Sequence, residues 1–540
     1  MKPLHEHLRQ HARTHPDKAA YIWYGRAISY AELDRASDAF AVKLDELGIK
    51  PGDPVVLFMN NCPQYVMAHY GIQKLGAIVC PCGPLNKEHE LEYQLNDLQA
   101  RVIVAADNLL PVVDKVRGKT ALQHVFSVNY TDLLPPPGSP APIVLPAELQ
   151  AMLEQRKSSA TPEQARAEVI DFLQAVGKVG AEKESPHPEL SMDDVALMTY
   201  TSGTTGLPKG AMLSYRNAVY KTAAGVSNGN IGNSDVLLAV APLYHIAGMI
   251  MGVNCTVYSG ATCVLLYRFD PLAVLQAIQH YKVSYWYSIA PMNVALMQVP
   301  SIKEFDLSSL RTNLVTSFGI TFTEALANQW KQYVPQCGMA EAAYGLSETH
   351  TLDTYMPLDA IRWGTQGKPI AGCEIRIIDP DTRQQCSTGD IGEIVLRSAG
   401  VFKGYWNKPE ATAQTLRDGW VYTGDMGTLD ADGYLNFIGR FKEMIKVSGY
   451  SVFPEEVETI LIKHPAIAQA AAIGIADADK GEVVKAFVVL KPCHEAQATD
   501  IISWARENMA TYKAPREVAF IDALPATGAG KVLRRLLKDR

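Results

Sequence analysis

The sequence predicts an α/β fold in which a large N-terminal domain of several α/β layers precedes a small C-terminal α+β domain. The chain has 540 residues, and one hydrophobic core stops growing at roughly 250–300 residues, so we expect at least two domains. Segments with helical and strand periodicity alternate over residues 1–100 and again over 194–438, which is typical of layered α/β domains. The apolar segments beyond Arg440 are shorter. We therefore expect the domains to span 1–439 and 440–540.

Three pairs of helix and strand are predicted in the first hundred residues. The segment Ser29–Glu32 reads Ser-Tyr-Ala-Glu, a capping box that predicts the start of a helix continuing to about Leu47. Pro51 and Gly52 then turn the chain into an apolar strand. The expected strands are 54–59, 77–82 and 101–105, and the expected later helices are 65–75 and 88–98.

Two segments in the middle of the chain depart from this alternation. Residues 130–193 are rich in proline and charge, so we expect a surface excursion with one helix and no catalytic role. Residues 236–267 contain no Asp, Glu, Lys or Arg, as a membrane span would. Pro242, His245 and Asn254 interrupt this run, so we expect a strand, a helix and a strand in a buried core. The C-terminal domain should supply strands at 469–475, 483–490 and 517–521 and a helix at 501–509.

The composition excludes several classes of protein. Hydrophobic residues make up 47%, charged residues 20% and aromatic residues 8%, which excludes a disordered, collagen-like or coiled-coil chain. The net charge of −7 argues against a nucleic-acid or anionic-membrane binder. The nine cysteines lack the spacing of a disulfide framework or a zinc site, and the N-terminus has no secretory signal. We therefore expect a cytoplasmic protein with no nucleic-acid partner and no integral membrane segment.

A segment rich in hydroxyl groups and glycine follows the apolar residues 195–198. Thr199–Gly210 reads TYTSGTTGLPKG and holds five Ser or Thr hydroxyls, three glycines and Lys209. Glycine lets backbone N–H groups approach a phosphate, hydroxyls donate hydrogen bonds and lysine supplies charge, so this composition suits an oligophosphate. A flexible surface turn is the alternative that composition alone leaves open. No dinucleotide fingerprint follows a strand, and Val532 stands where a P-loop would need Ser or Thr.

The residue sequence of this segment resembles the signature of the adenylate-forming superfamily. That superfamily contains acyl-CoA synthetases, luciferases and peptide-synthetase adenylation domains. Further motifs of that superfamily follow in order: PLYHIAGM at 242–249, YGLSE at 344–348, GEIVLRS at 392–398, GYWNKPEAT at 404–412, YTGD at 422–425, GRFKEMIKVSGYSVFPEEVE at 439–458 and GAGKVLRR at 528–535. The resemblance implies that the small C-terminal domain is mobile. It also implies that a carboxylic acid is joined to AMP from ATP and is then passed to a thiol.

The resemblance further implies a nucleotide site. The hydroxyl-rich loop would hold the β- and γ-phosphates of ATP, and Asp425 would accept hydrogen bonds from both ribose hydroxyls. Magnesium, a hard cation that prefers oxygen ligands, would bind Thr204 and Glu348. The residues implied in nucleotide or coenzyme binding are Thr201, Ser202, Gly203, Thr204, Thr205, Gly206, Lys209, Tyr344, Gly345, Ser347, Asp425, Arg440 and Gly449.

Other positions match the catalytic and moving parts of the superfamily. Lys531 would neutralise charge between the carboxylate and the α-phosphate, and His245 would move between the two half-reactions and open the acyl pocket. Lys442 falls at the hinge position. Lys446 and Gly449 lie in the loop used for thioester formation, where a glycine leaves a passage for the pantetheine arm of coenzyme A. The expected catalytic residues are Lys531, His245, Lys446 and Glu348.

The acyl pocket is where the resemblance is least specific. Amino-acid activators of the superfamily place an aspartate near the PLYH segment to pair with the substrate ammonium, and none occurs between Asp235 and Asp270. An acid with an uncharged acyl chain is therefore expected rather than an amino acid. A medium- or long-chain fatty acid is the first expectation and an aryl acid the alternative, with coenzyme A as acceptor. A non-catalytic nucleotide-binding protein on a decayed synthetase scaffold is the alternative from another class. The expected pocket residues are Tyr244, Ala247, Met249, Phe318, Gly319, Leu346 and His350.

Overall fold

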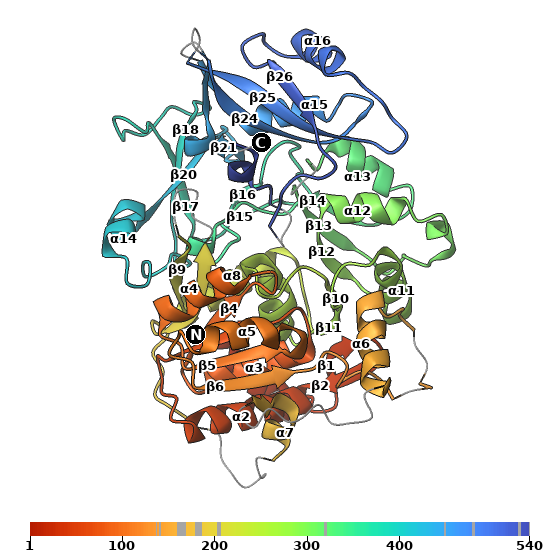
Figure 1. Cartoon of the computed structure of the whole chain (residues 1–540), viewed down its shortest axis with the longest axis vertical. Helices are drawn as coiled ribbons and strands as arrows, with labels where there is room; N and C mark the ends of the chain where they lie inside the picture. The colour runs from red at the N-terminus through yellow and green to blue at the C-terminus, as the bar shows by residue number, and fades with distance from the viewer. Residues whose placement is uncertain are drawn as a thin grey trace.

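Two seven-stranded sheets form most of the large domain in the computed structural model (Figure 1). The structure describes residues 1–136, 138–139, 142–158, 169–178, 186–201, 207–317, 321–447, 450–477, 481–527 and 531–538. The first sheet is parallel except for its last hairpin and runs, in spatial order, through β7 (Val169–Asp171), β6 (His124–Val128), β5 (Val102–Ala106), β3 (Pro54–Phe58), β4 (Ile78–Cys82), β8 (Val195–Thr201) and β9 (Lys209–Ser214).

The second sheet is also parallel except at one end, where the N-terminal hairpin joins it. Its strands lie in the order β14 (Gly338–Glu341), β13 (Thr312–Thr316), β12 (Tyr285–Ile289), β10 (Val236–Ala239), β11 (Thr262–Leu265), β1 (Ala19–Trp23) and β2 (Arg26–Ser29). Parallel strands need crossover connections, and the intervening helices supply them. The predicted α/β class is confirmed.

The helices begin where the sequence places capping and turn residues. The Ser29 hydroxyl accepts the N–H of Glu32 at 3.1 Å, so the predicted capped helix is confirmed. The helices of the large domain are α1 (Leu4–Thr14), α2 (Tyr30–Glu46), α3 (Pro63–Lys74), α4 (Glu88–Leu98), α5 (Leu110–Arg117), α6 (Ala147–Ser158), α7 (Phe172–Gly177), α8 (Tyr215–Asn228), α9 (Ile246–Met249), α10 (Thr256–Ser259), α11 (Pro271–Tyr281), α12 (Ala290–Met297), α13 (Glu324–Trp330) and α14 (Pro409–Thr415).

Helix α3 is buried along its whole length, which is expected of a helix that packs on all sides. The hydroxyls of Tyr65 and Tyr70, both in α3, donate to the carbonyls of Leu243 and Val253 in the apolar segment between β10 and β11. One hydrophobic core therefore joins the two sheets through this layer.

The middle of the chain partly follows the predictions. The uncharged run 236–267 forms β10, a helical stretch over 246–259 and β11, as predicted. Within the described part of the chain, no helix combines the length and the apolar character needed to cross a bilayer. The excursion at 130–193 was expected to hold one helix, but it holds α6, α7 and β7. The apolar pair Val169 and Ile170 extends the first sheet by pairing with β6, an interaction that local composition does not reveal.

A two-stranded sheet of β15 (Thr354–Tyr355) and β16 (Lys368–Pro369), a larger third sheet and the C-terminal domain complete the fold. The third sheet contains β17 (Glu374–Ile378), β18 (Gly392–Arg397), β19 (Leu416–Arg417), β20 (Trp420–Leu429) and β21 (Leu435–Arg440). The C-terminal domain, blue in Figure 1, contains β22 (Ile445–Val447), β23 (Tyr450–Val452), α15 (Pro454–Leu461), β24 (Ile467–Asp477), β25 (Gly481–Leu490), α16 (Ala498–Asn508) and β26 (Glu517–Phe520). It has a hydrophobic core of its own, built from residues between Ile445 and Ala514. The predicted strands and helix of this domain are confirmed.

Candidate active site

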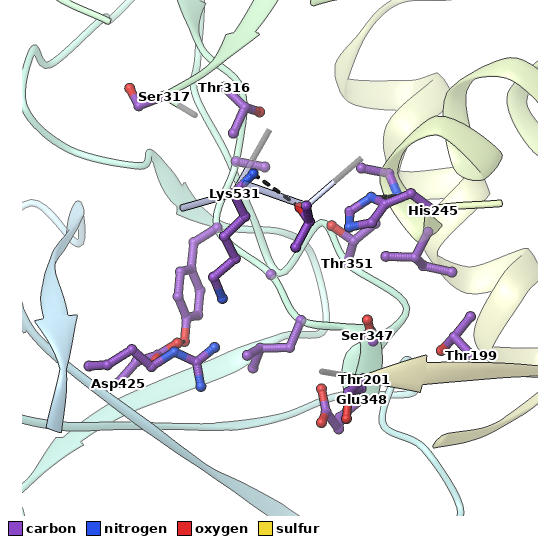
Figure 2. Close-up of a pocket in the computed structure, with 18 of the residues that line it drawn as sticks. Thr199, Thr201, His245, Thr316, Ser317, Ser347, Glu348, Thr351, Asp425 and Lys531 are labelled. Carbon is purple, nitrogen blue, oxygen red and sulfur yellow. Dashed lines mark hydrogen bonds and ion pairs between the residues drawn. The ribbon is translucent and has the colours of Figure 1, made fainter. Parts of the chain in front are cut away.

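A cavity of about 920 Å³ lies between the large domain and the C-terminal domain. Its wall includes residues at the carboxyl ends of parallel strands, among them Thr201, Thr316 and Glu341. In open α/β sheets, ligands bind outside the carboxyl ends of the strands. The C-terminal domain contributes Lys531, and Figure 2 shows its side chain entering the same space as Glu348 and Asp425.

The ends of the hydroxyl-rich loop reach this cavity. Thr201 and Lys209 face each other across the β8–β9 hairpin, and both line the cavity. The Tyr200 hydroxyl donates to Asp97 at 2.7 Å, and the Tyr93 hydroxyl donates to the carbonyl of Pro208 at 2.9 Å, so both ends of the loop are tied to α4. The loop residues Ser202, Gly203, Thr204, Thr205 and Gly206 lie outside the described part of the chain.

Tyr405 links Lys209 to Glu348. Its hydroxyl donates to Glu348 Oε1 at 2.7 Å, and Lys209 Nζ lies 5.1 Å from the centre of its ring. The ring face attracts the ammonium group, and the hydroxyl orients the carboxylate. Tyr405 was not among the predicted site residues, although the GYWNKPEAT motif that contains it was recognised. The signal was present in the sequence, but the motif alone does not indicate which residue contacts the site.

The Asp425 side chain is buried at one side of the cavity. Its Oδ2 accepts the Tyr344 hydroxyl at 2.6 Å, and its Oδ1 lies 2.6 Å from Arg440 Nε. Burial raises the pKa of Asp425, and the Arg440 guanidinium opposes that increase. Each carboxylate oxygen has two lone pairs, so both remain able to accept a further hydrogen bond from a ligand. The geometry therefore suits the diol-binding role that was predicted for Asp425.

Lys531 stands in the cavity because the chain around it is held at two points. Arg534 pairs with Glu455 at 3.0 Å and with Glu458 at 2.8 Å, which anchors the C-terminal segment to α15. The N–H of Lys531 donates to the Thr527 hydroxyl at 3.1 Å, which ties Lys531 to Thr527. Burial and the nearby Arg440 guanidinium lower the pKa of Lys531. The carboxylates of Asp425 and Glu443 oppose this lowering, and an anionic ligand in the cavity would stabilise the ammonium form further.

His245 also lines the cavity, at the N-terminus of α9. Its Nδ1 accepts the N–H of Ala247 at 3.4 Å, so the neutral ring carries its proton on Nε2. Burial lowers the pKa of His245 to about 4, and the charge of Lys531 acts in the same direction. The ring is therefore neutral at pH 7.

Some of the residues predicted for the acyl pocket lie in the cavity wall. Tyr244, Ala247 and Leu346 line the cavity, together with Gly345 and Ser347 from the predicted nucleotide site. Phe318 and Gly319 lie outside the described residues, as does Gly449.

Two predicted pocket residues need correction, because the structure places Met249 and His350 in the interior and not in the cavity wall. Ile246, Ala247, Ile250 and Met251 share the cavity-facing side of their helical stretch, and Met249 lies on the other side. His350 adopts a left-handed conformation with φ 58°, and its side chain is fully buried.

The hinge and loop lysines lie in different places. Lys442 lines the cavity, close to where the chain passes from the third sheet to the C-terminal domain. Lys446 is exposed outside the cavity, and its Nζ donates to the Ser451 hydroxyl at 3.0 Å. The structure therefore brings Lys531, and not Lys446, to the site.

Glu341 is a cavity residue that the sequence analysis missed. Its carboxylate accepts the N–H of Ser317 at 3.1 Å and the Ser317 hydroxyl at 2.5 Å, and Ser317 Oγ accepts the N–H of Phe322 at 2.8 Å. Burial raises the pKa of Glu341 to about 7, against the lowering effect of Ser317. No sequence motif marked this position, because an isolated glutamate after an apolar strand is commonly solvent-exposed.

The raised pKa of Glu341 predicts a pH-dependent stability. The ordinary pKa of a glutamate is 4.5, and that of Glu341 in the folded protein is about 7. Between these two pH values Glu341 binds more protons in the folded protein than in the unfolded chain, so the free energy of unfolding falls as pH rises. The loss amounts to about 3 kcal/mol at most. We expect Glu341→Gln to flatten this slope in urea unfolding measured from pH 5 to pH 8. Glu324→Gln, at an exposed position, should keep the wild-type slope, and an unchanged slope in Glu341→Gln would contradict the assignment.

Comparisons with known proteins cover nearly the whole chain. A family model described as AMP-binding enzyme matches residues 8–406, and one described as AMP-binding enzyme C-terminal domain matches residues 456–531. A long-chain-fatty-acid–CoA ligase of Bacillus subtilis is 33% identical over 549 residues, covering 100% of this chain and 94% of that protein.

Solved structures show the same arrangement of elements. The anthranilate CoA ligase AuaEII in complex with anthranoyl-AMP superposes with a TM-score of 0.85 at 28% identity, covering 100% of this chain and 97% of that one. ATP-bound MatB from Rhodopseudomonas palustris gives a TM-score of 0.84 at 25% identity, covering 100% and 99%. The chain belongs to the AMP-binding enzyme family, in the acyl-CoA synthetase branch of the adenylate-forming superfamily.

Proposed function

We propose that the chain is an ATP-dependent acid–thiol ligase that activates a carboxylic acid as an acyl-adenylate and transfers the acyl group to coenzyme A, with release of pyrophosphate and AMP. One observation carries the proposal: charged groups of both domains converge on a single cavity. Lys209, Glu348, Asp425, Arg440 and Lys531 all line it. The named relative, a fatty-acid–CoA ligase, and the anthranoyl-AMP complex support the same chemistry.

In the first half-reaction, a carboxylate oxygen attacks the α-phosphorus of ATP and pyrophosphate leaves. Both reactants are anionic, so fixed positive charge lowers the barrier. Lys531 supplies that charge where carboxylate and α-phosphate meet, and Asp425 with Arg440 holds the ribose. Thr201 and Lys209 hold the β- and γ-phosphates together with Ser202, Gly203, Thr204, Thr205 and Gly206. Gly345 and Ser347 belong to the same nucleotide site.

The residues at the cavity fit a magnesium ion. Mg²⁺ is usually bound by one or two carboxylates and by the phosphates of its substrate, and it needs no cage of protein ligands. Glu348 offers such a carboxylate, oriented by Tyr405, and Thr204 would be the second ligand. Among the described residues, no cluster of three or more His, Cys, Asp or Glu side chains is arranged to hold a metal by itself. When bound, the ion would neutralise charge on the phosphates.

In the second half-reaction, the thiol of coenzyme A attacks the acyl carbonyl and AMP leaves. We propose that the C-terminal domain, residues 440–540, turns about Lys442 and replaces Lys531 with the loop of Lys446 and Gly449. His245 would open the acyl pocket during this change. The exposed position of Lys446 supports this assignment, because a group that serves only the second step is not needed in the adenylation geometry.

The acid is proposed to be a medium- or long-chain fatty acid. Ile250, Met251, Leu314 and Leu352 give part of the cavity wall an apolar surface that suits an alkyl chain. An aryl acid is the second candidate, because Tyr244, Tyr285 and Tyr287 line the same cavity and aromatic rings pack well against one another.

One assay tests the function and the acid together. ATP–pyrophosphate exchange is measured with a panel of fatty acids of increasing chain length and of benzoate and cinnamate acids, followed by thioester formation with coenzyme A. Exchange that depends on the acid supports the ligase, and the preferred series identifies the acid. Nucleotide binding without exchange for any acid would favour the non-catalytic alternative.

Tyr405→Phe tests the link between Lys209 and Glu348. Loss of one hydrogen bond to a charged group costs about 1.5–3 kcal/mol, so we expect the half-saturating concentration of Mg·ATP to rise by roughly 10–100-fold. The KM for the acid should change little. Tyr422→Phe, a tyrosine at the cavity whose hydroxyl contacts neither Lys209 nor Glu348 in the described contacts, is the control. Equal changes in both KM values would refute the role.

A further inference from the structure

A lysine and an aspartate form an ion pair in the interior behind the candidate active site. Lys221 lies in α8, and Asp353 follows the turn that carries Glu348. Both side chains are 0% exposed, and Lys221 Nζ lies 2.5 Å from Asp353 Oδ1. Neither residue lines the cavity. The pair therefore does not contact a ligand in the cavity directly, and any role it has in ligand binding must act through other residues.

The ion pair joins α8 to a backbone stretch in an unfavourable conformation. His350, Thr351 and Leu352 have φ values of 58°, 55° and 54°, three consecutive left-handed residues of which none is glycine. Such residues persist only where the surrounding structure holds them. Lys221 Nζ donates to the carbonyl of Leu352 at 3.0 Å. The pair thus fixes the C-terminal end of the left-handed stretch.

The other oxygen of Asp353 fixes the N-terminal end. Asp353 Oδ2 accepts the Thr349 hydroxyl, and Thr349 Oγ1 in turn accepts the N–H of Leu346 at 3.2 Å. The N–H of Asp353 donates to the carbonyl of Tyr344 at 2.8 Å, which closes the turn. Residues 344–353 therefore form a turn that the backbone bond from Asp353 to Tyr344 closes, and the Asp353 carboxylate joins Thr349 within this turn to Lys221 in α8.

The opposite side of this turn forms part of the active-site wall. Ser347, Glu348 and Thr351 face the cavity, as Figure 2 shows. A Cβ placed on Gly345 would lie 2.5 Å from the backbone nitrogen of Leu352, so the left-handed stretch packs directly against the segment that carries Tyr344. A shift of the stretch would consequently move Glu348 and the backbone beside Tyr344.

Stability alone does not account for a buried charged pair. Replacing both partners by apolar residues of similar volume is often neutral or stabilising, whereas removing one partner leaves a buried charge without compensation. The fold also makes room for the lysine, since a Cβ on Gly400 would lie 2.1 Å from Lys221 Cε. A pair with these properties is better explained by the conformation that it imposes than by the stability that it adds.

We propose that the Lys221–Asp353 ion pair is a positioning device that holds the turn 344–353 in its left-handed conformation and thereby places Glu348 for Mg·ATP. The inference rests on the proposed function for the identity of the ligand. Lys221 and Asp353 are positioning residues, and they act through Glu348 and Tyr344.

The test separates positioning from stability by comparing single and double variants. Lys221→Met and Asp353→Asn each leave one partner unpaired and should lower the melting temperature. Lys221→Met/Asp353→Leu replaces the pair by apolar residues and should recover most of that loss. We expect the double variant nonetheless to bind Mg·ATP about 10–100-fold more weakly by calorimetry. Recovery of both melting temperature and Mg·ATP affinity in the double variant would overturn the proposal.

A second buried lysine provides the control. Lys74 is also 0% exposed, its Nζ lies 2.6 Å from Asp34 Oδ1 and 2.9 Å from Asp38 Oδ1, and none of these three residues lines the cavity. Lys74→Met should lower the melting temperature and leave the affinity for Mg·ATP unchanged. An equal loss of affinity in Lys74→Met would show that any destabilisation weakens binding, and would overturn the positioning role.

Hydrogen exchange of the unliganded protein tests the turn without any nucleotide. In the double variant, amides of residues 344–353 should exchange at least about tenfold faster than in wild type, with other segments unchanged. Unchanged exchange in this turn would overturn the proposal whatever the binding result. Wild-type protein that binds no Mg·ATP would instead refute the proposed function and the metal-positioning role, while the exchange result would still decide whether the pair holds the turn.

Discussion

Lys531→Ala is expected to lower acyl-adenylate formation by about 10²–10³-fold, the usual cost of removing one group that stabilises charge in a transition state. Lys531 enters the cavity from the C-terminal domain, and burial together with the Arg440 guanidinium lowers its pKa. Its charge is required where two anions meet, and the second half-reaction contains no such encounter. Conversion of preformed acyl-adenylate to thioester should therefore stay within a few-fold of wild type.

The two half-reactions are measured separately. ATP–pyrophosphate exchange reports the first, and release of AMP from preformed acyl-adenylate with coenzyme A reports the second. Lys538→Ala is the matched control, because Lys538 is exposed on the same C-terminal segment and does not line the cavity. It should match wild type in both assays. An equal loss in both half-reactions of Lys531→Ala would refute the assigned role.

Lys446→Ala is expected to give the reverse pattern, with thioester formation lowered by about 10²-fold, a typical effect of misplaced reacting groups. The side chain is exposed and outside the cavity in the structure, so adenylation should not depend on it. It would matter only after the C-terminal domain has turned. Pyrophosphate exchange should stay near the wild-type rate while AMP release slows.

An exposed lysine elsewhere in the C-terminal domain controls for the lost charge. Lys463→Ala removes an exposed lysine that follows the C-cap of α15, and both half-reactions should proceed as in wild type. A loss of pyrophosphate exchange as large as the loss of thioester formation in Lys446→Ala would argue against two working orientations of the C-terminal domain.

Much of the fold was predictable because it depends on local patterns. The capping box at Ser29, the apolar strands of the first sheet and the short strands after Arg440 all appear where the sequence indicates them. These signals lie within a few residues of one another along the chain. Strand β7 was missed because its two apolar residues gain their role only by pairing with β6, more than forty residues earlier.

The sequence by itself predicted which charged groups share one cavity. Four charged residues occur in motifs whose order and residue sequence are specific. All four line one cavity: Lys209, Glu348, Asp425 and Lys531. Side-chain direction was less predictable. Met249 was assigned to the pocket from its motif, but the rotation of the helical stretch directs it into the core.

Only the tertiary structure revealed the groups that support the site. The Tyr405 hydroxyl on Glu348, the Glu341 carboxylate on Ser317 and the Lys221–Asp353 pair join residues that are 24 to 132 positions apart. No local pattern encodes such partners, because hydrogen bonds and ion pairs depend on distances that exist only after the sheets and helices have packed. Short motifs in the sequence predicted the charged groups that line the cavity, and the packed fold decided which other residues contact them.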